Sequence, residues 1–509
     1  MTQSAIRPAF FIAALSSLGL AQSPEQVADT LGLSACDVSH VQMYGYPGAP
    51  ASAAFTFDGS QHTIQLEPIS IRSEGFKLVI QKDGDVYEEV APQIPLTYQG
   101  VIPTMPGTIV RASWLADGLH ARLRMADGSD FWLEPVVNKI PGSDPAAHAL
   151  YRSEDVLPNY GTCGTDAGAA SEHTPNKLGR DELNLLGGGF NVAELGLDAD
   201  FEYYQDYGSS VANTTAQMES VINSMNVQYQ NDCNITHVVS HVIVRTTSND
   251  PYSSTNPSTL LNQFTNHWNS AQSGVQRDVA ELFTGKNLSG SVIGIAWLNG
   301  VCNSSGYNVV ESDCCGSFAS KTDLSAHELG HNWGEGHCSC SGWTMNSFLT
   351  SANQFHPTFS APGITQKGNT LNCIDQGGGG GGECDISQYG TGLGGGNFGT
   401  LSSTTDPQLG TNFVWTYSGF ASNASGRIVI ALQQASIPFV SETILVQYQN
   451  AAFEIDTTAN SAGAGSESAA IPNVAALIGN TYYSQVGMID GSTSSGWAFS
   501  NGLSLTICN

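Results

Sequence analysis

Alternating apolar and polar residues dominate the chain before residue 180. Short segments of this kind, such as Phe55–Phe57 and Leu119–Leu123, flank Asp-Gly pairs that begin at Asp58, Asp83, Asp117 and Asp127. A segment with period two buries one face of a strand, and an Asp-Gly pair between two such segments is typical of a β-hairpin turn. Residues 22–185 are therefore predicted to form a β-rich region.

Helical and strand-like patterns alternate in the middle of the chain. Met218, Val221, Ile222 and Met225 recur at the spacing of one helix face. A β-prone stretch follows at 235–244, then a helical pattern at 260–268 and a further strand at 292–298. This alternation predicts an α/β domain over residues 186–376.

A run of six glycines, Gly377–Gly382, ends this pattern. Glycine has no side chain to pack and great backbone freedom, so residues 377–383 are predicted to be a flexible linker. Beyond it, turn-rich segments separate five β-prone runs at 413–417, 428–432, 444–448, 481–488 and 503–507. Short strands with this spacing predict an antiparallel β-sandwich over residues 384–509 in a multidomain chain.

One segment, His-Glu-Leu-Gly-His-Asn-Trp-Gly-Glu-Gly-His from His327 to His337, concentrates residues that bind metals. His327 and His331 are four apart, so on a helix both imidazoles share one face and reach one metal ion. Gly334 can take a positive φ, end the helix and bring back His337 as a third nitrogen ligand. Three protein ligands leave the fourth tetrahedral position of Zn²⁺ open, which is typical of catalytic zinc. Glu328 is placed to take a proton from water there.

A chance histidine cluster is the alternative to a zinc site. A bare HExxH motif arises by accident fairly often, whereas the extended motif with its glycine in register is far more specific. Met345, in Gly-Trp-Thr-Met-Asn-Ser, stands where this class of site places a methionine turn beneath the metal. A lone methionine is more often core filling, but its position soon after the three histidines favours the floor of the site.

With these motifs the chain resembles the metzincin metalloproteases, and within them the adamalysin (reprolysin, ADAM-like) branch. Residues 277–285 (RDVAELFTG) and 293–302 (IGIAWLNGVC) resemble the adamalysin pattern, and residues 193–200 (AELGLDAD) resemble its first strand. Astacin-like and serralysin-like metzincins usually have tyrosine two residues after the methionine, where this chain has Ser347. The family usually has aspartate after the third histidine, where this chain has Cys338. The resemblance implies a mixed-sheet metzincin catalytic domain over residues 186–376.

The resemblance also implies features around the catalytic motif. In the family, the strand that corresponds to residues 292–298 is an edge strand, and an extended substrate pairs with it in the antiparallel direction. A Cys302–Cys373 disulfide is implied, together with a calcium site at Glu194, Asp278 and the carbonyl of Cys373. Gln376 stands in place of the usual asparagine ligand. Carboxylates that bind no calcium are the alternative.

A propeptide is implied as well, because the run from Tyr98 to Pro135 resembles the one that precedes adamalysin catalytic domains. Residues 22–185 would then be the propeptide. Cys163 lies where related zymogens supply a thiolate to the open zinc position, and thiolate is a strong zinc ligand. The alternative is a disulfide with Cys36, the other cysteine ahead of the catalytic domain. Activation by the first route requires a cut after Cys163, for which Lys177–Arg180 is a basic candidate.

The net charge and the N-terminal residues indicate which binding partners and which cellular compartment to expect. With 45 acidic and 17 basic residues the formal charge is −28, which disfavours nucleic acid and anionic membranes as partners. The excess of carboxylates favours solubility and is compatible with Ca²⁺. An apolar run at 10–20, followed by Ala21, predicts a signal peptide over residues 1–21 and a secreted, extracellular product. No other stretch is predicted to span a membrane.

Eleven cysteines in an exported chain predict disulfides, and their odd number leaves at least one thiol unpaired. Cys384 and Cys508 bracket the C-terminal region and are a predicted pair. The pairing of Cys314, Cys315, Cys338 and Cys340 stays open, because spacing alone does not determine connectivity.

These features predict a secreted zinc endopeptidase made as a zymogen, which acts on protein or peptide substrates through water activated by zinc and Glu328. The alternative is a secreted metal-binding adhesion protein with weak or no proteolysis, whose C-terminal domain binds an unknown surface or ligand. Glu328 disfavours this alternative, because a protein without a reaction needs no base beside the metal.

Overall fold

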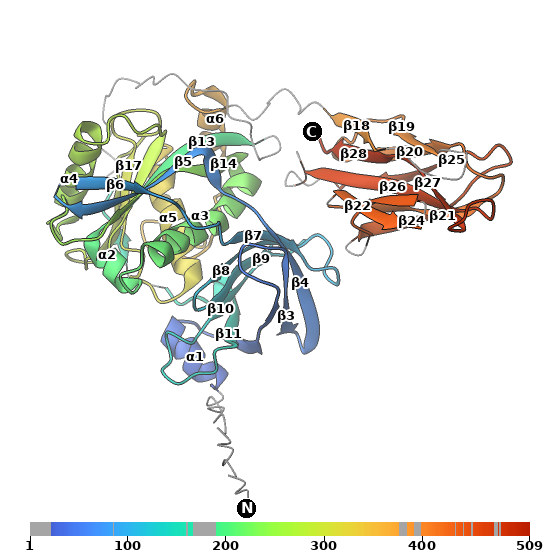
Figure 1. Ribbon diagram of the computed structural model, residues 1–509. Helices are drawn as coiled ribbons and strands as arrows, with labels where there is room; N and C mark the ends of the chain where they lie inside the picture. The colour runs from blue at the N-terminus through green and yellow to red at the C-terminus, as the bar shows by residue number, and fades with distance from the viewer. Residues whose placement is uncertain are drawn as a thin grey trace, which may run out of the picture.

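The computed structural model describes residues 22–84, 86–158, 161–165, 190–375, 384–390, 399–432, 434–440, 442–448, 451–472, 477 and 480–508. Three predicted features lie outside these residues: the signal peptide at 1–21, the basic sequence Lys177–Arg180 and the glycine run Gly377–Gly382. They remain predictions. The described chain is rich in β-structure, with several sheets and few helices (Figure 1).

The part of the chain predicted as the β-rich region, residues 22–185, is called the first region from here on. It contains a nine-stranded antiparallel sheet, with strand order β1-β11-β10-β9-β8-β7-β4-β3-β2. All four Asp-Gly pairs join neighbouring antiparallel strands, which confirms the predicted hairpins. Helix α1 (Pro24–Leu31) begins at Ser23, whose side chain accepts from Gln26 N, and ends at Gly32, which has φ 70°. The strands are β1 (Asp37–His40), β2 (Gln42–Tyr44), β3 (Ala51–Phe57), β4 (Ser60–Pro68), β7 (Thr97–Val101), β8 (Ile109–Leu115), β9 (Gly118–Arg124), β10 (Asp130–Pro135) and β11 (Ala147–Arg152).

A second, mixed sheet has eight strands in the order β12-β16-β17-β15-β13-β14-β5-β6. Neighbours pair in parallel except β16 with β17 and β5 with β6. The strands are β5 (Arg72–Asp83), β6 (Val86–Val90), β12 (Thr162–Cys163), β13 (Asn191–Ala199), β14 (Ile235–Arg245), β15 (Val279–Phe283), β16 (Val292–Ala296) and β17 (Tyr307–Val310). Both edges of this sheet are thus formed by residues that precede 190, which the sequence pattern did not predict.

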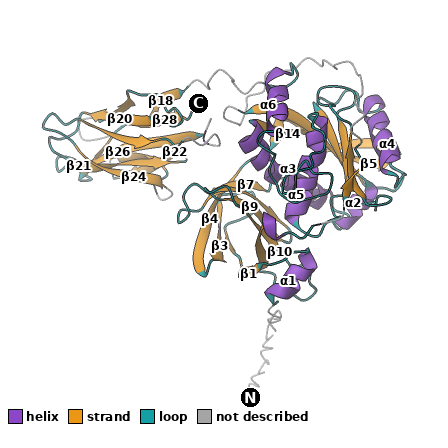
Figure 2. Cartoon of the chain, turned by 180° about the vertical axis from the view of Figure 1, so that it is seen from behind, coloured by secondary structure: helices purple, strands orange, loops and turns teal. Residues whose placement is uncertain are grey.

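Helices gather around this mixed sheet, as Figure 2 shows from behind. They are α2 (Phe201–Asp206), α3 (Val211–Cys233), α4 (Pro257–Ser270), α5 (Phe318–Asn332) and α6 (Ala361–Thr370). The predicted apolar face of α3 is confirmed, because Met218, Val221, Ile222 and Met225 are all fully buried. One apolar cluster joins them to Trp132 and Tyr151 of the first region, so the two regions share a core.

The C-terminal strands form sheets of their own, drawn in orange to red in Figure 1. A six-stranded sheet has the order β18-β28-β26-β21-β24 with β27 beside β26, a three-stranded sheet has the order β19-β20-β25, and β22 pairs with β23. All these pairs are antiparallel. The strands are β18 (Asp385–Tyr389), β19 (Thr400–Ser403), β20 (Asn412–Ser418), β21 (Ser425–Ala431), β22 (Gln434–Phe439), β23 (Glu442–Val446), β24 (Ala451–Thr458), β25 (Gly465–Ala470), β26 (Thr481–Ile489), β27 (Trp497–Phe499) and β28 (Gly502–Thr506).

Four disulfides stabilise the described chain. The predicted Cys302–Cys373 and Cys384–Cys508 pairs are both present. The remaining pairs join close neighbours, Cys314 with Cys315 and Cys338 with Cys340. Cys36, Cys163 and Cys233 are free thiols. Within the described residues, no helix has both the length and the apolar character needed to cross a membrane.

Candidate metal centre and active site

Helix α5 brings His327 and His331 to one face, as their spacing predicts. The helix ends at Asn332, and Gly334 has φ 95°, a left-handed conformation that glycine adopts without strain. The chain then returns toward the helix with His337. The Nε2 atom of His331 lies 3.0 Å from that of His327 and 3.1 Å from that of His337. The structure therefore brings all three predicted ligands together.

The other nitrogen of two rings is held by the backbone. His327 Nδ1 lies 2.6 Å from the carbonyl oxygen of Thr344, and His331 Nδ1 lies 2.6 Å from that of Glu335. Each Nδ1 donates its proton to a carbonyl, which leaves the Nε2 lone pairs pointing at one another. Burial lowers the pKa of His327 to about 4 and that of His331 as well, so both rings are neutral near pH 7.

These residues fit a zinc ion. Neutral imidazoles are preferred zinc ligands, and Zn–N bonds of about 2.0–2.1 Å place the nitrogens roughly 3.3 Å apart in a tetrahedron. Cys163, His327, His331 and His337 each offer one ligand atom, and these four atoms lie within 4.8 Å of one another. The donor set therefore suits Zn²⁺ better than a hard cation such as Ca²⁺ or Mg²⁺.

Glu328 lies beside the first histidine and is completely buried. Its Oε2 accepts from Cys163 Sγ at 3.4 Å, and its Oε1 has no hydrogen-bond partner among the described residues. Burial raises the pKa of Glu328 well above its ordinary value. Gly294 of β16 leaves the space for this carboxylate, because a Cβ there would overlap Glu328 Oε1. A buried carboxylate with an elevated pKa thus contacts the same Cys163 sulfur that approaches His331 Nε2.

Cys163 reaches the same cluster from β12. Its Sγ lies 3.3 Å from His331 Nε2, and β12 pairs in parallel with β16. Gly164 N donates to Gly294 O at 2.9 Å, and Cys163 N donates to Ser347 O at 3.2 Å, so the segment is bound on two sides. Cys36 and Cys163 are both free, and the alternative disulfide between them is absent.

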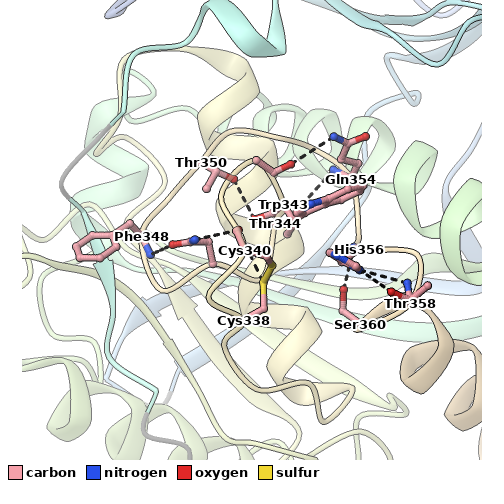
Figure 3. The surroundings of a disulfide bond; sticks show 12 residues. Cys338, Cys340, Trp343, Thr344, Phe348, Thr350, Gln354, His356, Thr358 and Ser360 are labelled. Atoms are coloured by element: carbon pink, nitrogen blue, oxygen red, sulfur yellow. Dashed lines mark hydrogen bonds between the residues drawn. A yellow bond between two sulfur atoms is a disulfide. The ribbon is translucent and has the colours of Figure 1, made fainter.

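Met345 lies beneath α5 and is completely buried. Gly330 allows this close packing, because a Cβ there would overlap the Met345 sulfur. Cys338 N donates to Met345 O at 2.8 Å, and Asn346 Nδ2 donates to Cys340 O at 2.9 Å. Figure 3 shows the disulfide that joins Cys338 to Cys340. The Cys338–Cys340 disulfide therefore supports the chain between His337 and the methionine, in the place where the family usually has an aspartate.

The start of α5 differs from what local spacing predicts. The helix begins at Phe318 with Ser317 as its N-cap, whose side chain accepts from Ser320 N at 3.2 Å. The three-residue spacing of Ser320 and Asp323 predicts a capping box, but Asp323 lies in the second turn and accepts from residues 344–353. These partners are distant in sequence, so local spacing held no signal for them.

Glu281 of β15 is a second buried carboxylate that sequence reasoning missed. It accepts from Ser325 Oγ of α5 at 2.7 Å, and its Oε2 has no hydrogen-bond partner among the described residues. Burial raises the pKa of Glu281 to about 8. An alternating strand pattern normally places apolar residues on the buried face, and only the packed sheet identifies Glu281 as an exception.

Of the residues predicted to bind calcium, Glu194 lies within β13, Asp278 directly precedes β15, and Cys373 follows α6. Glu194 N donates to Asp278 Oδ2 at 2.8 Å, and Gln276 Nε2 donates to Glu194 Oε2 at 2.8 Å. Asp278 also lies beside the Cys302–Cys373 disulfide, whose bonded sulfurs offer no thiolate. Gln376 is outside the described residues. Calcium binding stays a prediction.

Comparisons with known proteins agree with this geometry. Residues 191–370 match the reprolysin model of metallo-peptidase family M12. Disintegrin and metalloproteinase domain-containing protein 19 of Mus musculus is 26% identical over 244 residues, and that of Homo sapiens is 29% identical over 260 residues. These matches cover 44% and 47% of this chain but only 26% of each relative.

One solved structure, titled "Structure of a chaperone-substrate complex", covers 35% of this chain and 38% of that chain at 14% identity, with a TM-score of 0.29. A likeness this low has no bearing on the fold. The family match covers the three histidines, Glu328 and Met345. This chain therefore contains, over residues 191–370, an ADAM/reprolysin-like metzincin domain of metallopeptidase family M12.

Proposed function

We propose that this protein is a secreted zinc-dependent endopeptidase, made as a zymogen, that hydrolyses peptide bonds of extracellular proteins. One observation supports this above all: three histidine Nε2 atoms converge, and the sulfur of Cys163 that approaches them also contacts the buried carboxylate of Glu328. That arrangement combines a metal site with a base, as hydrolysis by activated water requires.

In this proposal His327, His331 and His337 hold zinc, and Met345 forms the floor of the site. Zinc bound there supplies a Lewis acid that polarises the scissile carbonyl and lowers the pKa of water. Glu328 takes the proton from the attacking water and returns it to the leaving amine. The elevated pKa of Glu328 suits both steps, because a base that is too acidic does not hold the proton it has taken.

The substrate is proposed to bind along β16. An extended peptide that runs antiparallel to an edge strand gains backbone hydrogen bonds, and its side chains enter pockets on alternate sides. Thr162 and Cys163 pair with this strand in parallel, so they run opposite to the proposed substrate. A peptide bound in the reversed direction does not present its carbonyl as a substrate does.

The zymogen state is proposed to depend on Cys163. Its sulfur lies close enough to His331 and Glu328 to exclude the attacking water from the fourth zinc position. Activation then requires release of β12 from β16, which a cut between Cys163 and β13 would permit even while the rest of the first region stays bound. Lys177–Arg180 is a candidate for this cut. Residues 1–21 would be the signal peptide and residues 22–185 the propeptide.

The remaining assignments belong to the same proposal. Residues 186–376 would be the catalytic domain, 377–383 the linker and 384–509 a β-sandwich accessory domain. Glu194, Asp278 and the carbonyl of Cys373 would hold structural Ca²⁺ beside the Cys302–Cys373 disulfide. The C-terminal domain has no catalytic role in this scheme and is proposed to bind an unidentified surface or ligand.

The proposal is tested by casein hydrolysis and metal analysis of protein cut near Arg180, for wild type and Glu328→Ala. We expect one zinc per chain in both proteins. Chelator-sensitive cleavage is expected in wild type alone, with turnover reduced at least about a thousandfold in the variant, because the base is lost. Zinc in both proteins with cleavage in neither would favour the alternative of a metal-binding adhesion protein. Equal cleavage by both would exclude Glu328 as the base.

A further inference from the structure

A buried carboxylate outside the ligand set joins α5 to the loop beneath the histidines. Asp323 lies one helical turn before His327 and is completely buried. Its Oδ1 accepts from Thr344 Oγ1 at 2.6 Å and from Asn353 N at 3.0 Å. Its Oδ2 accepts from Ala352 N at 3.1 Å and from Thr350 Oγ1 at 3.3 Å. All four donors belong to residues 344–353, so one side chain holds this loop against the helix.

Thr344 connects this carboxylate to the first zinc ligand. Its hydroxyl accepts from Gln228 Nε2 and from Gln354 N, both at 3.1 Å, so its single proton is left for Asp323. Its backbone carbonyl accepts from His327 Nδ1 at 2.6 Å. Figure 3 shows Thr344, Thr350 and Gln354 together in this loop. The orientation of the His327 ring therefore depends on where Thr344 is held.

The backbone of the loop needs this support. Ser351 has φ 56° and Asn353 has φ 51°, a left-handed conformation that non-glycine residues adopt at a cost. The amides of Ala352 and Asn353 both point at Asp323, and Asn353 Nδ2 donates to Ala319 O of α5 at 3.0 Å. Without the carboxylate, two buried backbone N–H groups lose their acceptor, and the strained turn loses the interactions that compensate for it.

We propose that Asp323 is a positioning residue for the metal site: through Thr344 it fixes the ring of His327 and thereby sets the affinity for the ion. The proposal rests on the zinc site described under the proposed function. Hydrogen-bond partners of metal-bound histidines orient the ring and select its tautomer, and their loss typically weakens metal binding by about 10- to 100-fold. Here the partner is a backbone carbonyl, and Asp323 holds it from the ligand helix itself.

The test is a titration of the intact chain with Co²⁺ against a chelator, with the visible absorption of the bound ion as a second readout. Asp323→Asn keeps the shape of the side chain but turns a donor toward Ala352 N or Asn353 N. Thr344→Val removes the hydroxyl that Asp323 accepts from and keeps the carbonyl. We expect each variant to lower the Co²⁺ affinity about 10-fold or more and to alter the absorption spectrum.

Two controls separate positioning from general stability. Thr344→Ser keeps the hydroxyl and is expected to bind Co²⁺ within about twofold of wild type. Asp232→Asn changes another carboxylate, which accepts from Phe355 N at 2.8 Å and does not contact Thr344 or a histidine of the site. It is expected to lower the melting temperature without changing the affinity. If Asp323→Asn does not fold, Thr344→Val alone decides the question.

Wild-type affinity and spectrum in Thr344→Val would overturn the proposal and leave Asp323 a structural role only. An equal loss of affinity in Asp232→Asn would also overturn it, because any destabilised variant would then bind metal poorly. Equal Co²⁺ binding by wild type and by His337→Ala would instead show that the proposed function itself is wrong. In that case the histidines are not the ligands, and the positioning role is refuted with them.

Discussion

Cys163 shows what a single side chain determines in this molecule. Burial and the neighbouring carboxylate of Glu328 both raise the pKa of its thiol, so without a metal the group is a neutral S–H. A bound zinc ion reverses this, because it stabilises the thiolate as a ligand. The same atom can thus be an inert thiol or the fourth ligand, depending on whether the proposed site holds its metal. Its spatial neighbours, rather than its place in the sequence, give it this property.

Replacing Cys163 with serine is expected to activate the uncut chain. Serine is a poorer zinc ligand than thiolate, so water gains access to the fourth position although β12 remains beside β16. Peptide hydrolysis by the intact chain should rise at least about tenfold over wild type. Cys36→Ser, at a free thiol in the first region, is the matched control and should change nothing. No gain in Cys163→Ser would contradict the role of the thiol in the zymogen.

Helix α5 depends on a residue from another part of the chain for its start. Glu134 of β10 is buried, and its Oε1 accepts from Phe318 N at 2.8 Å and from Tyr151 OH at 2.5 Å. Lys139 Nζ pairs with Glu134 Oε2 at 3.0 Å. A carboxylate near the first amides of a helix satisfies donors that have no partner in the helix and interacts favourably with the helix dipole. The first region thus completes the helix that holds the histidines.

Glu134→Leu should therefore destabilise the intact chain. The change leaves the buried Phe318 amide without its acceptor and removes the carboxylate that pairs with Lys139, and we expect a loss of about 2–4 kcal/mol in the free energy of unfolding. Glu134→Gln keeps an acceptor for Phe318 and should lose clearly less. Urea unfolding followed by far-UV circular dichroism measures both. If the two variants are as stable as wild type, Glu134 does not support the helix.

At the scale of the molecule, the first region and the metzincin domain form one folded unit. Strands β5 and β6 extend the mixed sheet beyond β14, and β12 covers its opposite edge. Arg72 pairs with Glu219 of α3 at 2.5 Å, and both side chains are buried. Arg122, completely buried, donates to Ser224 O at 3.1 Å and to Asn353 O at 2.6 Å. The apolar core that the two regions share is unfavourable to expose to water, and these buried groups already have partners across the contact, so the contact resists separation.

A cut between β12 and β13 should therefore leave the first region bound. Trypsin cleavage after Lys177 or Arg180 is expected to yield two fragments that elute together from a size-exclusion column in native buffer and separate in denaturant. In Arg72→Ala, the buried Glu219 loses its partner, which costs about 3–5 kcal/mol, and the cut fragments should separate at lower urea. Lys77→Ala, at an exposed pair with Glu89, is the control. Separation of the wild-type fragments in native buffer would refute this prediction.

Local spacing along the chain is enough to determine much of this protein. The hairpins at Asp58 and Asp117, the apolar face of α3 and the meeting of His327 with His331 follow from the fixed periods of strand and helix. The glycine at 334 permits the return of His337 for an equally local reason. The Cys302–Cys373 pair follows from the family resemblance, and Cys384–Cys508 from position alone.

Only the tertiary structure decided the contacts between distant segments. In the tertiary structure Cys163 lies beside His331 and not beside Cys36. The β5–β6 hairpin and β12 lie at the two edges of the mixed sheet. Asp323 and Glu134 also have their partners only through tertiary contacts. The physical reason is that these partners lie far apart in the chain. A buried polar group must find a partner, but its own sequence neighbourhood does not state which of many distant groups will satisfy it.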